Sequence, residues 1–87
     1  MDDQTRRQRL RFRSWRRGTH EMDLLMGGFA DAFVPGFTRA QMDQYEAILR
    51  LEDLELFSWV TGGEKVPLSL DSEVMRLLLA HHLGRKK

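Results

Sequence analysis

The sequence predicts an all-α fold, a small bundle of five helices, and three observations support this prediction. β-branched residues are few, and only two prolines, Pro35 and Pro67, interrupt the chain. Apolar residues recur at intervals of three and four over several stretches, which is the spacing of one helix face. Residues with good helix propensity fill the positions between them. Short loops between short helices are typical of a helical bundle.

The first two helices are predicted at residues 4 to 16 and 19 to 33. The first is basic and ends before Gly18, a residue that suits a helix terminus. Thr19 is a plausible N-cap for the second helix. Gly27-Gly28 weakens that helix, since each glycine costs roughly 1 kcal/mol relative to alanine, and a kink or an early end there stays open as an alternative. The apolar contacts of the two helices are Leu10, Phe12 and Trp15, and Met22, Leu25, Met26, Phe29 and Phe33.

Three further helices complete the prediction. Thr38 and Gln41 have the spacing of a capping box and begin the third helix, which continues to about residue 50. The fourth runs from 53 to 60, and the fifth from 69 or 71 to 82, with Gly84 closing it before a basic tail at 84–87. The inward residues are expected to be Met42, Tyr45, Ile48 and Leu49, then Leu54, Phe57 and Trp59, then Val74, Leu77, Leu78 and Leu83.

Length and composition exclude several classes of protein. The 87 residues predict one domain, 1–87, whose core supplies a net stability of only about 3–5 kcal/mol. The chain contains no cysteine, which excludes disulfide scaffolds, thiolate metal sites and iron–sulfur clusters. No apolar run approaches the roughly 20 residues needed to cross a bilayer. The amino terminus lacks the apolar segment of a secretory signal, and we read it as part of the domain.

Charge is distributed unevenly along the chain. Residues 1–17 contain seven arginines and two aspartates, whereas residues 18–84 contain four basic and eleven acidic residues. A basic front on an acidic body suggests an anionic partner or a protein with its own charge pattern. Three interpretations of the basic first helix stay open: a solvated face, a surface for a protein partner, and a surface for nucleic acid or lipid.

The sequence offers little for catalysis or metal binding. His81 and His82 are adjacent, so on a helix their side chains point about 100° apart and do not chelate one ion together. His20 stands without a nucleophile or a paired carboxylate nearby in sequence. The glycine pairs lack the spacing of a phosphate-binding loop. We therefore predict no catalytic residue, no metal site and no enzyme.

The stretch Arg17-Gly18-Thr19-His20-Glu21 places a glycine between opposite charges. One interpretation is a surface ion pair between Arg17 and Glu21, worth about 0.2–1 kcal/mol. The other is a docking face, because a glycine lets a partner backbone approach and the two flanking charges supply directional hydrogen bonds. Composition alone does not decide between them.

Two motifs resemble those of the SdhE family, the family of succinate dehydrogenase assembly factor 2. Residues 17–21 match the R-G-x-x-E motif, preceded by Trp15-Arg16 and followed by Asp23. Residues 45–60 resemble the leucine-rich segment that ends in D-x-x-L-F-x-W-L, with Val60 in place of the last leucine. The order of the motifs and the length of the chain also agree with the family. A single R-G-x-x-E would be weak, but the pair is specific.

The resemblance implies a five-helix assembly factor that binds the flavoprotein subunit of succinate dehydrogenase, and often of fumarate reductase, and promotes covalent attachment of FAD. FAD is then the cofactor of the client, and this chain holds none. The partner-binding residues implied by the motif are Arg16, Arg17, Gly18, Glu21 and Asp23. Trp15, Phe57 and Trp59 are expected to hold the bundle together. Gly18→Arg is expected to leave folding nearly intact while abolishing flavinylation of the client.

We expect the protein to be a monomer. We also expect a bacterial cytoplasm rather than a mitochondrial matrix, because no transit segment is evident. Three alternative functions stay open. The first is a helical module that binds nucleic acid or a membrane surface through residues 6–17, with steeply salt-dependent affinity. The second is a carrier that itself binds FAD, for which a bundle of this size has little interior volume. The third is a structural domain of a larger complex.

Overall fold

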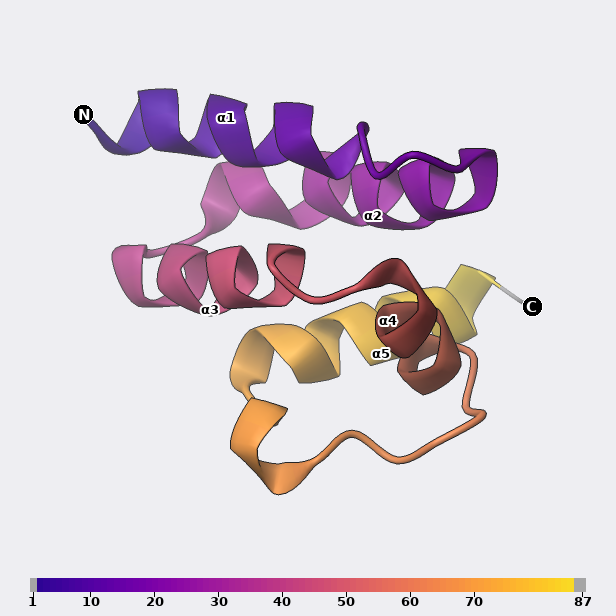
Figure 1. The fold of residues 1–87 in the computed structure, drawn as a ribbon. Coiled ribbons are helices and arrows are strands. Elements are labelled where there is room, and N and C mark those ends of the chain that lie inside the picture. The colour runs from indigo at the N-terminus through magenta and orange to yellow at the C-terminus, as the bar shows by residue number, and fades with distance from the viewer. Residues whose placement is uncertain (1, 86–87) are drawn as a thin grey trace.

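The computed structural model describes residues 2–85 and confirms the all-α prediction (Figure 1). Five α-helices and two short 3-10 helices follow one another along these residues. The α-helices are α1 (Asp3–Ser14), α2 (His20–Phe33), α3 (Arg39–Leu49), α4 (Asp53–Val60) and α5 (Glu73–Arg85). The 3-10 helices are η1 (Val34–Gly36) and η2 (Leu68–Leu70). Lys86 and Lys87 of the predicted basic tail lie outside the described residues.

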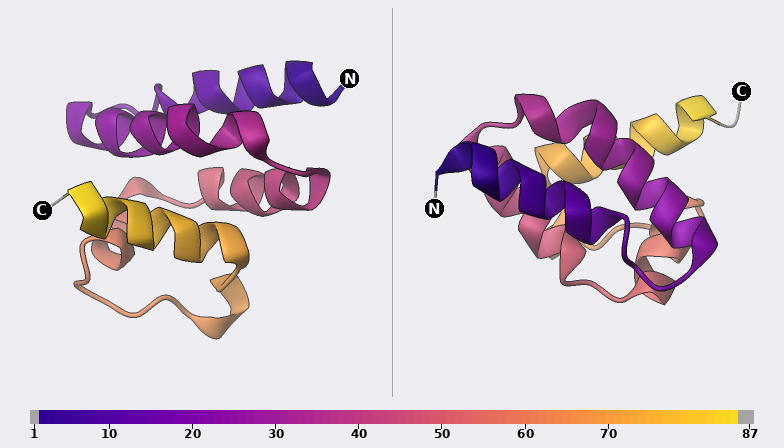
Figure 2. Two further views of the ribbon diagram at one scale, coloured as in Figure 1. Left: turned by 180° about the vertical axis from the view of Figure 1, so that it is seen from behind. Right: turned by 90° about the horizontal axis from the view of Figure 1, so that it is seen from above.

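The helices form two packed groups, α1 with α2 and α5 with α3 and α4 (Figure 1). Helix α1 contacts both α2 and α3, and α5 contacts α2, α3 and α4 (Figures 1 and 2). Contacts of α1 with α3 and of α2 with α5 therefore join the amino-terminal helices α1 and α2 to the rest of the bundle. The side chains of Phe29, Tyr45 and Phe37 meet where the groups join, with ring centroids 5.5–6.2 Å apart.

The core is made of the apolar stripes of α2 to α5, together with Leu10 of α1 and with Val34 and Phe37 between α2 and α3. Most of the residues predicted to point inward are buried. Those with no exposed surface are Met26, Phe29, Ala30, Val34, Met42, Tyr45, Leu56, Val74 and Leu78. Burying one such large side chain stabilises the fold by roughly 1.5–3 kcal/mol.

Side chains cap the predicted helix starts. The Thr19 hydroxyl accepts a hydrogen bond from the backbone N–H of Met22, which confirms the predicted N-cap. Thr38 and Gln41 form both hydrogen bonds of the predicted capping box. Helix α4 has the predicted bounds, and α2 continues through Gly27-Gly28 to Phe33. The second helix therefore reaches its predicted end at Phe33, and the two glycines do not stop it.

Five residues predicted to face the core are exposed. Phe12, Leu54 and Leu83 have 59%, 83% and 63% of their surface accessible, and Trp15 and Phe57 each have 39%. Positions two apart on a helix point about 200° apart, so burial of Leu10 and Leu56 turns Phe12 and Leu54 to solvent. Leu83 belongs to the end of α5, which continues to Arg85 and past Gly84, where the sequence predicted its stop.

The start of α5 was also placed too early. The segment Leu68–Leu70 forms the separate helix η2, and α5 begins at Glu73. The hydroxyl of Ser72 accepts a hydrogen bond from the backbone N–H of Met75. This hydroxyl satisfies one of the backbone donors that the first turn of a helix leaves free, and it fixes the start two residues after Asp71.

Candidate functional site

The motif Arg17–Glu21 occupies the loop between α1 and α2 and the first turn of α2. Helix α1 ends at Ser14, two residues earlier than predicted. Gly18 has a φ of +110°, a conformation that side chains with a Cβ rarely adopt. No atom lies within 4 Å of the position that a Cβ would take at Gly18. The glycine is therefore required by the backbone turn, and space for a side chain remains above it.

Arg17 points into the protein, with only 10% of its side chain exposed. Its guanidinium donates hydrogen bonds of 2.6 and 2.7 Å to the backbone carbonyls of Leu49 and Leu51. Its Nε donates to Oδ1 of Asp53 at 2.8 Å. These acceptors are the end of α3, the connection after it and the first residue of α4. Arg17 thus joins the α1–α2 loop to the α3–α4 connection.

Asp23 fixes the same loop from the other side. Its Oδ1 accepts hydrogen bonds from the backbone N–H groups of Arg17, at 2.6 Å, and Gly18, at 3.3 Å. The carboxylate lies in the first turn of α2, where negative charge is favourable. Of the two interpretations of the motif, the surface ion pair between Arg17 and Glu21 does not form, because the guanidinium is turned inward to Asp53.

Gly18, Thr19, His20 and Glu21 of the motif are exposed, as is Arg16 before it. The guanidinium carbon of Arg16 lies 4.2 Å from the centre of the Phe12 ring. The side chain of Glu21 makes no hydrogen bond or ion pair within residues 2–85. An open groove runs beside these groups and is lined by Trp15, Arg16, Gly18, Thr19, His20 and Asp23. We call the exposed Arg16, Gly18 and Glu21 the motif surface.

The aromatic residues near the motif divide between core and surface. The Trp15 ring lies against Gly27, where an added Cβ would come within 2.2 Å of a ring atom. Its Nε1 also donates to Asp31 at 3.3 Å. Trp59 is buried and Phe57 is half-exposed. Trp15 and Trp59 pack against the bundle as expected, and Gly27 is required by the packing of Trp15.

Sequence reasoning did not identify Asp53 or the carbonyls of Leu49 and Leu51 as partners of the motif. The signal was present, because Asp53 opens the D-x-x-L-F segment that forms the second motif. The structure shows that these two motifs are in direct contact through Arg17.

Two classes of site are absent from the part of the chain that the structure describes. No three histidine or acidic side chains there gather closely enough to hold a metal ion. No helix among residues 2–85 has the length and apolar character needed to span a membrane. His81 packs its ring against Phe29 and Phe33, in agreement with a structural role.

Comparison with known proteins adds the family. The sequence model of the family described as "Flavinator of succinate dehydrogenase" matches residues 8–82. The mitochondrial succinate dehydrogenase assembly factor 2-A of Drosophila ananassae is 38% identical over 86 residues, 97% of this chain and 55% of that protein. The mitochondrial assembly factor 2-B of Drosophila yakuba is 34% identical, with the same coverage of both chains. This chain thus spans about half the length of these curated relatives, and it belongs to the family of succinate dehydrogenase flavinators.

Proposed function

We propose that this chain acts as a monomer that binds the flavoprotein subunit of succinate dehydrogenase and promotes covalent attachment of FAD to it. The family description names a flavinator of succinate dehydrogenase, and the relatives are named assembly factors of that enzyme. The flavoprotein of fumarate reductase is a second client of the same chemistry. The relatives are named mitochondrial, and the bacterial cytoplasm expected for this chain stays a prediction.

The observation that carries the proposal is the contrast between the inward and outward groups of one loop. Arg17 and Asp23 use their polar atoms inside the protein and give the loop a fixed shape. The Glu21 side chain is exposed without an internal partner, and beside it Gly18 leaves its outer side open, since no neighbouring side chain lies within 4 Å of where a Cβ would stand. On this proposal Arg16, Gly18 and Glu21 contact the client, while Arg17 and Asp23 position them.

The chemistry belongs to the client and its FAD. In that chemistry the 8α-methyl of the flavin would lose a proton and a histidine nitrogen of the client would bond to that carbon and release its own proton. The isoalloxazine would hold the electron pair as reduced flavin until an external electron acceptor reoxidises it. The chain described here contributes no catalytic group and holds no FAD. It holds the immature flavoprotein so that the histidine and the flavin meet in reactive geometry, and such orientation alone lowers a barrier by several kcal/mol.

The proposal is tested by co-expression of the tagged chain with the flavoprotein subunit of its own source. Glu21→Ala is compared with Glu55→Ala, because both residues are exposed glutamates in the first turn of a helix. We expect Glu21→Ala to reduce both recovery of the flavoprotein and its covalent flavin fluorescence in a denaturing gel. Glu55→Ala is expected to behave as wild type. Equal capture and flavinylation with both variants would remove Glu21 from the docking surface.

A further inference from the structure

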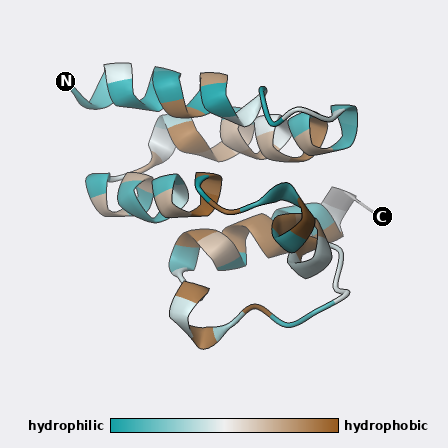
Figure 3. Cartoon of the chain, in the orientation of Figure 1, coloured by the Kyte–Doolittle hydropathy of each residue, from teal (hydrophilic) through white to brown (hydrophobic). Residues whose placement is uncertain are grey.

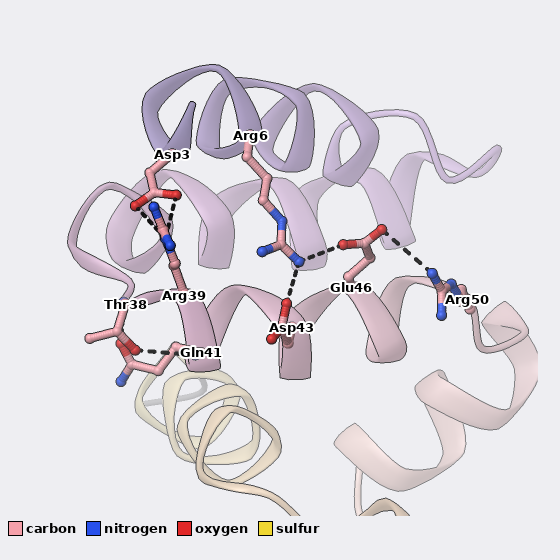
Figure 4. A network of polar contacts seen from close by, with 8 residues as sticks. All are labelled: Asp3, Arg6, Thr38, Arg39, Gln41, Asp43, Glu46 and Arg50. Atoms are coloured by element: carbon pink, nitrogen blue, oxygen red, sulfur yellow. Dashed lines mark hydrogen bonds and ion pairs between the residues drawn. The ribbon is translucent and has the colours of Figure 1, made fainter. Parts of the chain in front are cut away.

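The seven arginines of residues 6–17 fall into two groups. Four of them bond inside the protein: Arg6 to Asp43 and Glu46, Arg7 to the carbonyl of Phe37, Arg11 to Asp31, and Arg17 to Asp53. Figure 4 shows the first of these, together with the pair between Arg39 and Asp3. The guanidinium groups of the other three, Arg9, Arg13 and Arg16, have no carboxylate or carbonyl partner within residues 2–85.

Two of these arginines, Arg9 and Arg13, lie one turn apart on α1, with Phe12 three residues after Arg9. Arg16 follows just beyond the end of α1, and its backbone N–H still donates to the carbonyl of Arg13. All four side chains are exposed, and the Arg16 guanidinium lies over one face of the Phe12 ring. Figure 3 shows α1 as largely hydrophilic. We call Arg9, Phe12, Arg13 and Arg16 the arginine stripe.

The arginine stripe borders two grooves. The first, of about 510 Å³, separates the end of α1 from residues 51–54, and its outer edge carries the exposed Leu54. The second lies on the other side of Phe12 and is lined by Thr5, Gln8, Arg9, Phe12 and Arg13. Phe12 and Arg13 line both grooves. Arg16 also lines the groove beside Gly18, so the arginine stripe is continuous with the motif surface.

We propose that the groove between α1 and residues 51–54 binds an acidic segment of the client flavoprotein that also carries an apolar side chain. The carboxylates of that segment meet Arg13 and Arg16 in this groove and Arg9 where the segment continues past Phe12, and its apolar side chain lies between Phe12 and Leu54. The inference depends on the proposed function and gives the client a second contact beside the motif surface. Guanidinium groups without internal partners form charge-assisted hydrogen bonds with carboxylates, with directional geometry.

The groove favours a protein segment over nucleic acid or a membrane. Its second wall contains Glu52 and Asp53, so the anionic groups of an occupant must lie along the arginine wall only. A segment with a few carboxylates permits this, whereas a continuous run of phosphates does not. Arg16 covers one face of Phe12, so that face does not stack on a nucleic-acid base. Leu54 has 83% of its surface exposed. Contact with an apolar side chain would remove this surface from water, which is favourable, whereas contact with a phosphate backbone would bring no such gain. Four of the seven arginines are also already bonded inside the protein.

The test is the affinity of the purified full chain for the FAD-free flavoprotein subunit of its own source, measured by titration calorimetry. Arg13→Glu is paired with Lys65→Glu, an equal charge change at another exposed position. Leu54→Ala is paired with Leu68→Ala, where the control leucine is 92% exposed. We expect Arg13→Glu to raise Kd about tenfold at low ionic strength and less at about 1 M salt. Leu54→Ala is expected to raise Kd roughly fivefold.

Both controls are expected to keep the wild-type affinity, and circular dichroism checks that each variant is folded. Arg9→Glu repeats the charge test at the other end of the arginine stripe. If the wild type binds but all variants bind equally well, this inference is wrong while the proposed function stands. If the wild type does not bind the flavoprotein, both are wrong. Weaker binding of Arg13→Glu to phosphatidylglycerol vesicles with unchanged flavoprotein affinity would make the stripe a membrane surface and overturn the inference.

Discussion

Arg17 and Asp53, 36 residues apart in sequence, are joined by a hydrogen bond of 2.8 Å from the guanidinium Nε to the carboxylate Oδ1. Because Arg17 also donates to the carbonyls of Leu49 and Leu51, one side chain fixes the α1–α2 loop to the end of α3 and the start of α4. The two motifs of the sequence are parts of one structural unit. The shape of the motif surface therefore depends on a residue that faces away from it.

Replacement of Arg17 by alanine is expected to destabilise the fold by about 2–4 kcal/mol, because it leaves Asp53 and two carbonyls without their donor. Arg16→Ala removes an exposed arginine next to it and is expected to cost less than about 1 kcal/mol. Urea unfolding followed by circular dichroism measures both. A stability of Arg17→Ala equal to that of Arg16→Ala would show that the inward contacts contribute nothing.

Gly18→Ala and Gly18→Arg are both expected to lower stability by about 1–3 kcal/mol, because the φ of +110° is strained for any residue with a Cβ. The expectation from sequence, that Gly18→Arg leaves folding nearly intact, is corrected by this dihedral angle. Gly36→Ala is the control, since Gly36 has equal space around it and no positive φ. Thermal unfolding should show a loss for both Gly18 variants and no loss for Gly36→Ala.

Gly27→Ala is expected to displace the Trp15 ring, since the new Cβ would come within 2.2 Å of a ring atom. Alanine favours a helix over glycine by about 1 kcal/mol, so a gain in stability is the simple expectation. The steric conflict with Trp15 predicts a loss instead, together with a shift of tryptophan fluorescence to longer wavelength. In the Trp15→Ala background, Gly27→Ala should become stabilising. Stabilisation in both backgrounds would contradict the close packing.

We expect the folded protein to lose stability in alkali because the hydroxyl of Tyr45 is buried. Burial raises the pKa of Tyr45 to about 12, partly offset by its hydrogen bond with the Ser14 hydroxyl. The unfolded chain has a tyrosine pKa near 10, so the folded state holds this proton more tightly. The stabilising contribution is full below about pH 10 and is lost as the pH rises through 12.

The alkaline transition is measurable on this residue alone, because Tyr45 is the only tyrosine. Absorbance at about 295 nm should titrate near pH 12 in the folded protein. Tyr45→Phe should lose less stability between about pH 10 and 12 than the wild type. A folded protein whose tyrosine titrates near 10 would contradict the burial of its hydroxyl.

Local signals in the sequence predicted the helices and their starts. Thr19 and Thr38 act within one turn of the chain, so their capping roles follow from spacing alone. The apolar stripes of α2, α3 and α5 likewise identified most of the core. Phe12 and Leu54 were predicted to be buried but are exposed. The inner face and the outer face of a helix can both carry apolar residues, and only tertiary packing decides which of them is buried.

The internal partners of the motif were beyond such reasoning. Arg17 was expected at the surface because its nearest carboxylate in helical spacing is Glu21. Its partner Asp53 becomes a neighbour only when α1, α3 and α4 pack together. The contact of Trp15 with Gly27 has the same origin, since α1 and α2 must pack before the glycine has a reason to be there.

The measurement that tests the central proposal most directly is a reconstitution of flavinylation. Purified FAD-free flavoprotein subunit is mixed with excess FAD, with and without this chain, and covalent flavin is followed over time in a denaturing gel. We predict that the wild-type chain accelerates covalent attachment, and that Glu55→Ala does so equally while Glu21→Ala is at least about tenfold less effective. Equal rates of attachment with and without the wild-type chain would contradict the proposed function.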